Sequence, residues 1–536
     1  MKLFNRFAPL LLIAACTAPM MTGCAADDVA LEEDDLTSVT ARERALSFEG
    51  YVVVAANASD SAIKAAVTRE TQSAFGALRT ATIGVNDREL KDVDFATFVK
   101  EKVTVVDPNG GKTQALRVRY RFNDRAVVPV SMAKRSAIHL GLLHGDYQSQ
   151  SKKILVECTE NTKHDQEFEG SLWYVFNPSL PSCQDAIKVE DIAIQNARKE
   201  LTDPANEIVT AEQKRIYLPV TFKLEGKSTS STATYPEYDR LWRGGVEKDK
   251  VVVSLVSGVM ADWAAGEKPE LADDVGYYMF YQQMVEIEKQ LTGLKLTKTD
   301  GQDLTTFTAN GKTVKDVTWK DLKNWELFGT GYPAAFSSYT DRKALKVAVA
   351  NKLAKHWLTF EQPVSVSIAG EAPRDVTVVI KTYYGAETGD APHRTAMKTS
   401  DVVVYNGHSY IGYGPLDPSR YSASDFPSTY QLFFFNSCVS FNYYEADFIK
   451  MHPGGTANLD MITNGLESWV NGSGPSVGRF VASLLNGKQT SYLSLLKVTA
   501  KGSPATDVGI DGLRVVDGEL DNKFKPSKTS IKVILK

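Results

Sequence analysis

The 536-residue chain carries 61 basic and 65 acidic residues, so it has no excess of positive charge that would favour binding to nucleic acid. Its content of 43% hydrophobic and 24% charged residues is ordinary for a globular protein. About 510 residues follow the N-terminal segment described next, a length that favours two to four domains.

Residues 1–24 have the parts of a secretory signal peptide. Lys2 and Arg6 are basic, and the apolar run that follows is too short to span a bilayer, which needs about 20 residues. The segment ends in Met21-Thr22-Gly23-Cys24, which resembles the lipobox of bacterial lipoproteins and implies lipidation of Cys24. Cys16, in Ile13-Ala14-Ala15-Cys16, also fits this pattern, but cleavage there would leave a very short apolar region.

Residues 25–46 begin with small and acidic residues, which cannot bury a core, so we expect a disordered acidic tether. Ala25 replaces the aspartate that is associated with retention in the inner membrane, which favours the outer membrane. No later apolar stretch is long enough to span a bilayer. We therefore expect an exported protein that is anchored in the cell envelope by its lipid.

Residues 47–234 predict a β-rich α+β domain. A hairpin is indicated by strand-like residues 103–106 and 115–122 on either side of the turn at 107–111. In the second strand, apolar residues alternate with arginines, which predicts one buried and one solvated face. A helix is expected at 189–201. A Ser- and Thr-rich linker at 227–233 marks the end of this domain.

Two cysteines of this domain, Cys158 and Cys183, lie 25 residues apart. Export places them in a compartment that permits disulfides, so we expect them to pair. This pairing leaves Cys438 as the single unpaired cysteine outside the signal peptide.

Residues 235–536 predict an α/β layer domain. Its strands are read from short, continuous apolar runs at 251–256, 376–380, 402–405, 432–435 and 459–462. Continuous runs are typical of strands buried on both faces, as in a parallel sheet covered by helices. The covering helices are expected at 277–291, 344–357, 440–451 and 477–486, and Asn310-Gly311 indicates a hairpin.

Two of these runs are followed by reactive residues. His408 comes just after the run at 402–405, and Cys438 comes just after the run at 432–435. Ligands and catalytic groups gather at the carboxyl ends of strands in open α/β sheets, so we expect the two side chains to share one substrate. A neighbouring imidazole raises the thiolate fraction of a cysteine and can later protonate a leaving amine.

This pattern resembles the caspase-like cysteine peptidases, and most closely the gingipain type, over roughly residues 374–472. The corresponding motif is Tyr405-Asn406-Gly407-His408, followed 30 residues later by Cys438. The resemblance implies that His408 is the general base and acid and that Cys438 is the nucleophile. Backbone N–H groups beside Gly407 or at Cys438 are candidates for an oxyanion hole, and the resemblance implies that the amide at Ser409 contributes to it. Ser409 stands where the family has a glycine.

The sequence therefore predicts a surface-tethered cysteine endopeptidase that acts on polypeptides. The alternative is a non-catalytic envelope lipoprotein, with a binding or structural role, that keeps a caspase-like fold. The other histidines form no pattern with metal-ligand spacing, and Gly454-Gly455-Thr456 lacks the lysine of a phosphate loop. We expect no cofactor and no nucleic-acid partner.

Overall fold

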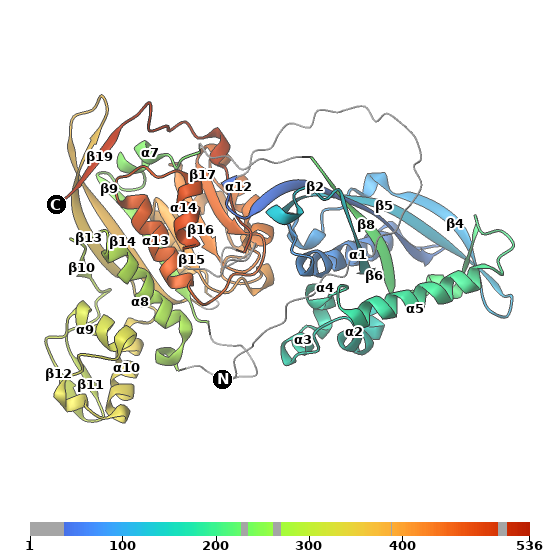
Figure 1. The fold of residues 1–536 in the computed structure, drawn as a ribbon, viewed down its shortest axis with the longest axis horizontal. Coiled ribbons are helices and arrows are strands. Elements are labelled where there is room, and N and C mark those ends of the chain that lie inside the picture. The colour runs from blue at the N-terminus through green and yellow to red at the C-terminus, as the bar shows by residue number, and fades with distance from the viewer. Residues whose placement is uncertain (1–36, 227–233, 261–269, 387–388, 502–511) are drawn as a thin grey trace. The chain divides into compact units, whose positions relative to one another are not determined.

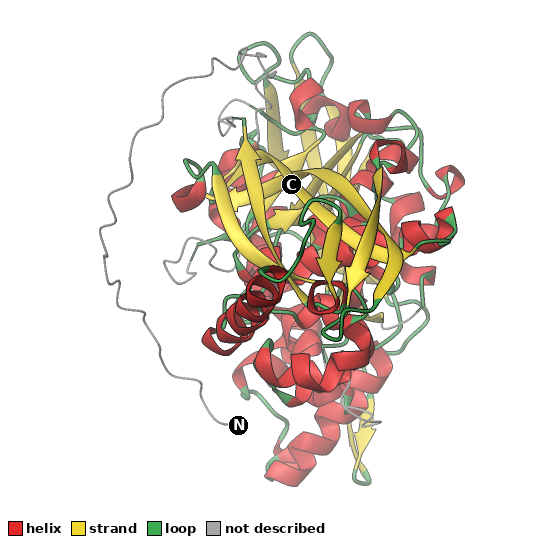
Figure 2. Ribbon diagram, turned by 90° about the vertical axis from the view of Figure 1, so that its right-hand side faces the viewer, coloured by secondary structure: helices red, strands yellow, loops and turns green. Residues whose placement is uncertain are grey.

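The computed structural model describes residues 37–226, 234–260, 270–386, 389–501 and 512–536. These residues form a mixed α/β structure with one ten-stranded and one seven-stranded sheet (Figure 1 and Figure 2). The expected signal peptide with Cys16 and Cys24 lies outside the described residues, as does the expected linker at 227–233.

Five parallel strands make up the centre of the ten-stranded sheet, in the order β17-β16-β15-β9-β14. Their bounds are β9 (Lys250–Gly258), β14 (Arg374–Ala386), β15 (Val402–Asn406), β16 (Gln431–Asn436) and β17 (Leu459–Asn464). They contain the five apolar runs of the sequence, and the expected parallel pairing of residues 402–405 with 432–435 is confirmed.

The edges of this sheet are antiparallel, which the sequence did not predict. The edge strands are β1 (Thr37–Ser38), β10 (Lys295–Lys298), β13 (Leu358–Ile368), β18 (Arg514–Asp517) and β19 (Ile531–Leu535). These strands are either short or alternate between buried and exposed residues. Their sequence pattern therefore does not show that they belong to the same sheet as the continuous apolar strands.

Helices cover both faces of the parallel strands. The helices are α8 (Val275–Glu288), α13 (Ser473–Leu485) and α14 (Tyr492–Thr499) on one face, and α11 (Ala391–Thr399) and α12 (Ala446–Met451) on the other. Figure 1 shows α8 and α13 side by side against the sheet. In β15, Val402 and Val404 pack in the core under α8, α13 and α14, whereas Val403 and Tyr405 pack in the core under α11 and α12. Every residue of the strand is therefore buried, as the continuous run predicted.

The helices expected at 277–291, 440–451 and 477–486 correspond to α8, α12 and α13, although the first turns of the second are a π-helix at Phe441–Glu445. The helix expected at 344–357 is α10, which begins earlier and ends at Leu353. The remaining elements are α7 (Tyr238–Trp242), α9 (Trp319–Lys323), α10 (Tyr339–Leu353) and the hairpin β11 (Phe307–Ala309) and β12 (Lys312–Val314). This hairpin turns at Asn310-Gly311, as expected.

The seven-stranded sheet has the order β6-β8-β2-β5-β4-β7, with β3 paired to β5. Its strands are β2 (Ala41–Ala55), β3 (Gly84–Val85), β4 (Val99–Val106), β5 (Lys112–Pro129), β6 (Ala137–Leu143), β7 (Glu207–Val209) and β8 (Tyr217–Glu225). The expected hairpin is β4–β5, closed by Val106 opposite Lys112. In β5, Val118, Tyr120 and Phe122 are buried, so the predicted alternation is confirmed.

Six helices accompany this sheet: α1 (Asp60–Thr80), α2 (Ser151–Glu157), α3 (Lys163–Glu167), α4 (Leu172–Val175), α5 (Pro181–Arg198) and α6 (Thr210–Gln213). The helix expected at 189–201 is the second half of α5, which begins with a proline, a residue suited to the first helical turn. Phe75 of α1 stacks on Tyr443, with 5.9 Å between the ring centroids, so the core under the seven-stranded sheet continues to the ten-stranded one.

The prediction of a tether as far as residue 46 is wrong for its last ten residues. Residues 37–38 form β1, which pairs with β18, and β2 begins at Ala41. Both precede residue 47, where we expected the β-rich domain to start. The run of acidic residues ends at Asp35, and Thr37, Val39 and Thr40 are β-branched residues, which favour strands.

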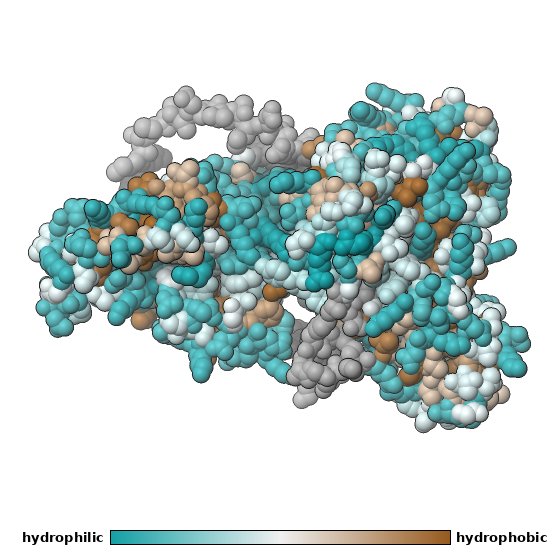
Figure 3. Space-filling model, turned by 180° about the vertical axis from the view of Figure 1, so that it is seen from behind, coloured by the Kyte–Doolittle hydropathy of each residue, from teal (hydrophilic) through white to brown (hydrophobic). Residues whose placement is uncertain are grey.

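No helix among the residues that the structure describes is long and apolar enough to cross a membrane. On the face shown in Figure 3, hydrophilic side chains cover most of the surface, and hydrophobic ones gather in small separate patches. Large apolar side chains such as Trp242 and Phe48 lie instead in the cores, where each is 1% exposed.

Candidate active site

His408 and Cys438 stand at equivalent positions beyond neighbouring parallel strands. Asn406 ends β15 and pairs with Asn436, which ends β16. His408 and Cys438 each follow two residues later, and parallel strands lie about 4.8 Å apart. The register therefore brings the histidine and the cysteine to the same edge of the sheet.

Both side chains line one pocket, with a volume of about 640 Å³. Each is partly exposed, so each can be reached from the pocket. The sixteen lining residues are Arg79, Thr80, Glu160, His164, Asp165, Glu167, Phe168, Tyr174, Val175, Asn177, His408, Ser409, Tyr410, Ile411, Cys438 and Glu467. A histidine and a free thiol thus face one space large enough for part of a peptide.

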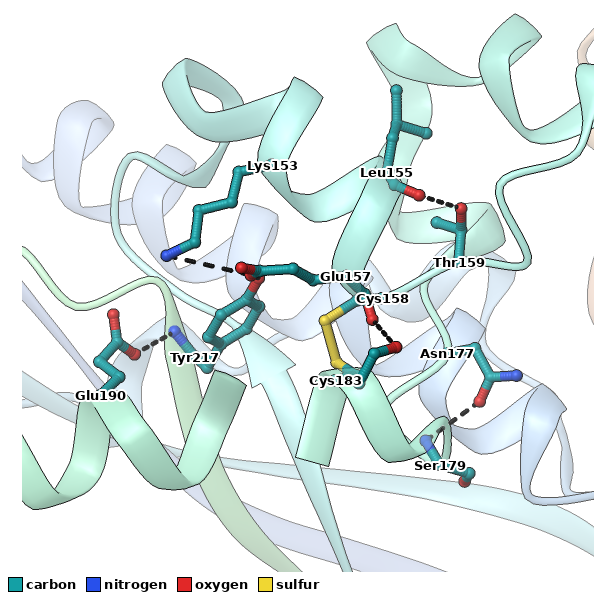
Figure 4. The surroundings of a disulfide bond; sticks show 11 residues. Lys153, Leu155, Glu157, Cys158, Thr159, Asn177, Ser179, Cys183, Glu190 and Tyr217 are labelled. Carbon is teal, nitrogen blue, oxygen red and sulfur yellow. Dashed lines mark hydrogen bonds and ion pairs between the residues drawn. A yellow bond between two sulfur atoms is a disulfide. The ribbon is translucent and has the colours of Figure 1, made fainter. Parts of the chain in front are cut away.

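A disulfide closes the segment that forms much of the pocket wall. Cys158 and Cys183 are bonded, which confirms the expected pair, and residues between them supply eight of the sixteen lining residues. Around the bond, the Tyr217 hydroxyl donates to the Glu157 carboxylate at 3.0 Å (Figure 4). The Ser182 hydroxyl donates to the Glu157 carbonyl at 2.6 Å. The disulfide therefore anchors both ends of the wall.

The turn after β16 places the residue next to the cysteine in a strained conformation. Val439 has a φ of 51°, in the left-handed region that β-branched residues rarely adopt. Its N–H donates to the carbonyl of Leu466 at 2.9 Å, which holds the turn. Ile411, near His408, has a φ of 47°. Such residues cost about 1–3 kcal/mol each and cluster at functional sites.

Two tyrosine hydroxyls hold the backbone around His408. Tyr405 donates to the carbonyl of His408 at 2.7 Å, and Tyr444 donates to the carbonyl of Ser409 at 2.7 Å. A Cβ atom on Gly407 would lie 2.4 Å from the Tyr405 hydroxyl, so only glycine fits there. Ser409 has an ordinary right-handed conformation (φ −83°, ψ −16°), which a serine adopts without strain.

The electrostatics at the thiol differ from the sequence-based expectation. Burial raises the pKa of the Cys438 thiol, the Glu467 carboxylate raises it further, and the Arg79 guanidinium lowers it. The sulfur lies 3.9 Å from the carbonyl oxygen of Ser468. The thiol is therefore protonated near neutral pH in the resting protein, whereas the sequence had favoured a populated thiolate.

The sequence did not indicate the wall at 160–177, nor Arg79 and Glu467. Arg79 and Glu467 are 388 positions apart and carry no motif. Among the residues that the structure describes, no group of three or more His, Cys, Asp or Glu side chains is arranged to hold a metal ion.

Comparisons with models of protein families, with curated proteins and with solved structures find no match to this chain. The pocket contains a thiol, an imidazole and a partly apolar wall.

Proposed function

We propose that this chain is a cysteine endopeptidase of the caspase-like type, in which His408 and Cys438 form the catalytic dyad. The observation that supports this most is the matched position of the two residues beyond β15 and β16, facing one pocket. The central parallel strands, covered by helices on both faces, are also what a caspase-like domain requires.

In this mechanism the proton moves during the reaction. His408 takes the proton from the Cys438 sulfur as the sulfur attacks the scissile carbonyl carbon, and the carbonyl oxygen becomes an oxyanion. Backbone N–H groups around Gly407 and Ser409 stabilise that charge. His408 then donates the proton to the leaving amine, and water hydrolyses the thioester with His408 again acting as base.

We further propose that the enzyme is exported and anchored in the outer membrane by a lipid on Cys24. The Cys158–Cys183 disulfide supports export, because such bonds persist in oxidising compartments. Cys24→Ser should release the protein from membranes, as measured by fractionation and by mass spectrometry of the lipid adduct. Continued membrane association without an adduct on Cys24 or Cys16 would contradict the anchor.

The peptidase proposal is tested with an unstructured protein as substrate. The wild-type chain should cleave it, and Cys438→Ala and His408→Ala should each abolish cleavage. Thermal midpoints should stay within about 2 °C, because each side chain is partly exposed to the pocket and Cys438 lies only at the margin of the core. His139→Ala is the matched control: His139 is exposed on β6 and should be replaceable without loss of activity.

A second function, a non-catalytic envelope lipoprotein with a binding or structural role, is favoured by one observation. The pKa of the Cys438 thiol is raised rather than lowered, which is the state of an unreactive cysteine. Under this proposal the wild-type chain cleaves nothing, and Cys438→Ala leaves partner binding unchanged.

A further inference from the structure

The segment after β17 contacts the cysteine turn on two sides. The carbonyl of Leu466 accepts the hydrogen bond from Val439, and the carbonyl of Ser468 lies 3.9 Å from the Cys438 sulfur. Glu467 lies between these two contacts in the chain, and its side chain lines the pocket. Whatever holds Glu467 therefore also holds the backbone that frames the thiol.

Arg79, from the end of α1, holds Glu467 through an ion pair. The Arg79 guanidinium also stacks on the Tyr174 ring, 4.5 Å from its centroid, and donates to the Tyr174 carbonyl at 2.7 Å. Its side chain is only 17% exposed, so the guanidinium is largely shielded from solvent, whereas the Glu467 side chain is 41% exposed. Arg79 thus links α1, the disulfide-closed wall and the segment next to Cys438.

The two charges act on the thiol in opposite directions. A carboxylate beside a thiol disfavours the thiolate, whereas a guanidinium favours it. The effects on the pKa of Cys438 have these signs: Glu467 raises it and Arg79 lowers it. The charges of Glu467 and Arg79 therefore have opposing effects on the fraction of Cys438 that is present as thiolate.

We propose that Arg79 and Glu467 form a positioning pair that sets the reactivity of Cys438. Arg79 comes from the β-rich region, and Glu467 comes from the segment after β17 of the ten-stranded sheet. This inference deepens the proposed function, because it takes Cys438 as the nucleophile. It assigns a role to the β-rich region: its first helix contributes a charge to the active site. A purely structural ion pair would hold the segments together without regulating the thiol.

The test is the pH dependence of alkylation of Cys438 by iodoacetamide, with Cys438→Ala as the blank. Arg79→Gln leaves the carboxylate alone beside the thiol, so the apparent pKa of alkylation should rise. Glu467→Gln leaves the guanidinium alone, so the pKa should fall. Each shift should be about half a unit or more for charges at a partly exposed site. The Arg79→Gln/Glu467→Gln double variant should lie between the two single variants.

Arg79→Lys is the conservative variant, which keeps the charge and should keep the pKa closer to the wild-type value than Arg79→Gln does. If Arg79→Gln fails to fold, Arg79→Lys and Glu467→Gln still provide the comparison, since Glu467 is 41% exposed and its replacement is tolerated. Shifts of the same sign in Arg79→Gln and Glu467→Gln, or no shift in Glu467→Gln, would overturn the proposal.

Parallel cleavage assays separate this inference from the proposed function. If the wild-type chain does not cleave protein but the alkylation pKa shifts in opposite directions, the peptidase proposal fails and the positioning pair stands. If the wild-type chain cleaves protein but the alkylation pKa does not move, the positioning pair fails alone.

Discussion

The two sheets bury their strands in different ways. In β16 every residue is buried, and successive side chains enter two different cores. In β5 the middle of the strand alternates, with Tyr120 and Phe122 buried and Arg119 and Arg121 exposed. In a strand that is covered on both faces the side chains are packed in the cores, and His408 and Cys438, which line the pocket, lie beyond the ends of their strands.

The β-rich region nevertheless contributes to the pocket. Its disulfide-closed segment forms a wall, and Arg79, which also lines the pocket, forms an ion pair with Glu467 of the segment after β17. The parallel sheet therefore positions His408 and Cys438, whereas helices of the β-rich region supply much of the wall of the pocket that they line.

The largest expected effect is the loss of stability when a phenylalanine of either core is replaced by alanine. Phe433→Ala and Phe434→Ala should each lower the free energy of unfolding by about 3–5 kcal/mol, because neighbouring residues of β16 fill separate cores. In β5, Phe122→Ala should cost a similar amount, whereas Arg121→Ala should stay within about 0.5 kcal/mol. Urea denaturation measures all four. A small effect for either phenylalanine of β16 would contradict the two-sided burial.

The disulfide should contribute less than a core phenylalanine. The Cys158→Ala/Cys183→Ala double variant should lose about 3 kcal/mol of stability, mainly because the unfolded chain gains freedom. Cleavage should also fall, since the wall of the pocket is no longer anchored at both ends. Cys438→Ala, measured by the same denaturation, is the control and should leave stability nearly unchanged. An unaffected double variant would show that other contacts hold the wall.

A pH dependence of stability should come from a histidine of the ten-stranded region. Burial lowers the pKa of His393 to about 3, and its pKa in the unfolded chain is about 6.5. The unfolded state therefore binds a proton first as the pH falls from about 6.5 towards 3. Stability should decrease over that window, with His393 contributing about 1.4 kcal/mol per pH unit.

Replacing this histidine should flatten the profile. His393→Phe keeps an aromatic ring near Tyr405, whose ring centroid is 5.1 Å from that of His393. Urea unfolding at pH 4.5, 5.5 and 6.5 should show a shallower slope than in the wild-type chain. His452, whose pKa burial lowers to about 4, should supply part of the slope that remains. An unchanged slope in His393→Phe would exclude His393 as its source.

The smallest effect is expected at Ser409. Because its backbone is already in a conformation open to any residue, Ser409→Gly should leave kcat/KM unchanged or somewhat higher. Gly407→Ala is the contrasting variant, because the added methyl group would collide with the Tyr405 hydroxyl and disturb His408. A marked loss of activity in Ser409→Gly would mean that the serine side chain itself takes part.

The features that could be predicted from the sequence depend on residues that are close together in the chain, or on the number of cysteines. Continuous apolar runs indicated β15 and β16, and the positions of His408 and Cys438 just after these runs indicated that the two residues lie at one edge of the sheet. Cysteine parity indicated the disulfide. Each of these needs only neighbouring residues or a count.

The features that could not be predicted depend on contacts between distant residues. β1 is two residues long and pairs with β18, almost 480 positions away, so no periodicity marks it. The pocket wall consists of short helices such as α3 and α4, whose role arises from where the disulfide places them. The raised pKa of Cys438 follows from burial, which one sequence does not specify.

Whether His408 and Cys438 act as a pair in one pocket is decided by the distance between the Cys438 sulfur and the nearer imidazole nitrogen of His408, measured in a crystal structure. We expect at most about 6 Å, since resting sites are looser than hydrogen-bond range. An imidazole turned out of the pocket, with the sulfur packed away from it, would contradict the account.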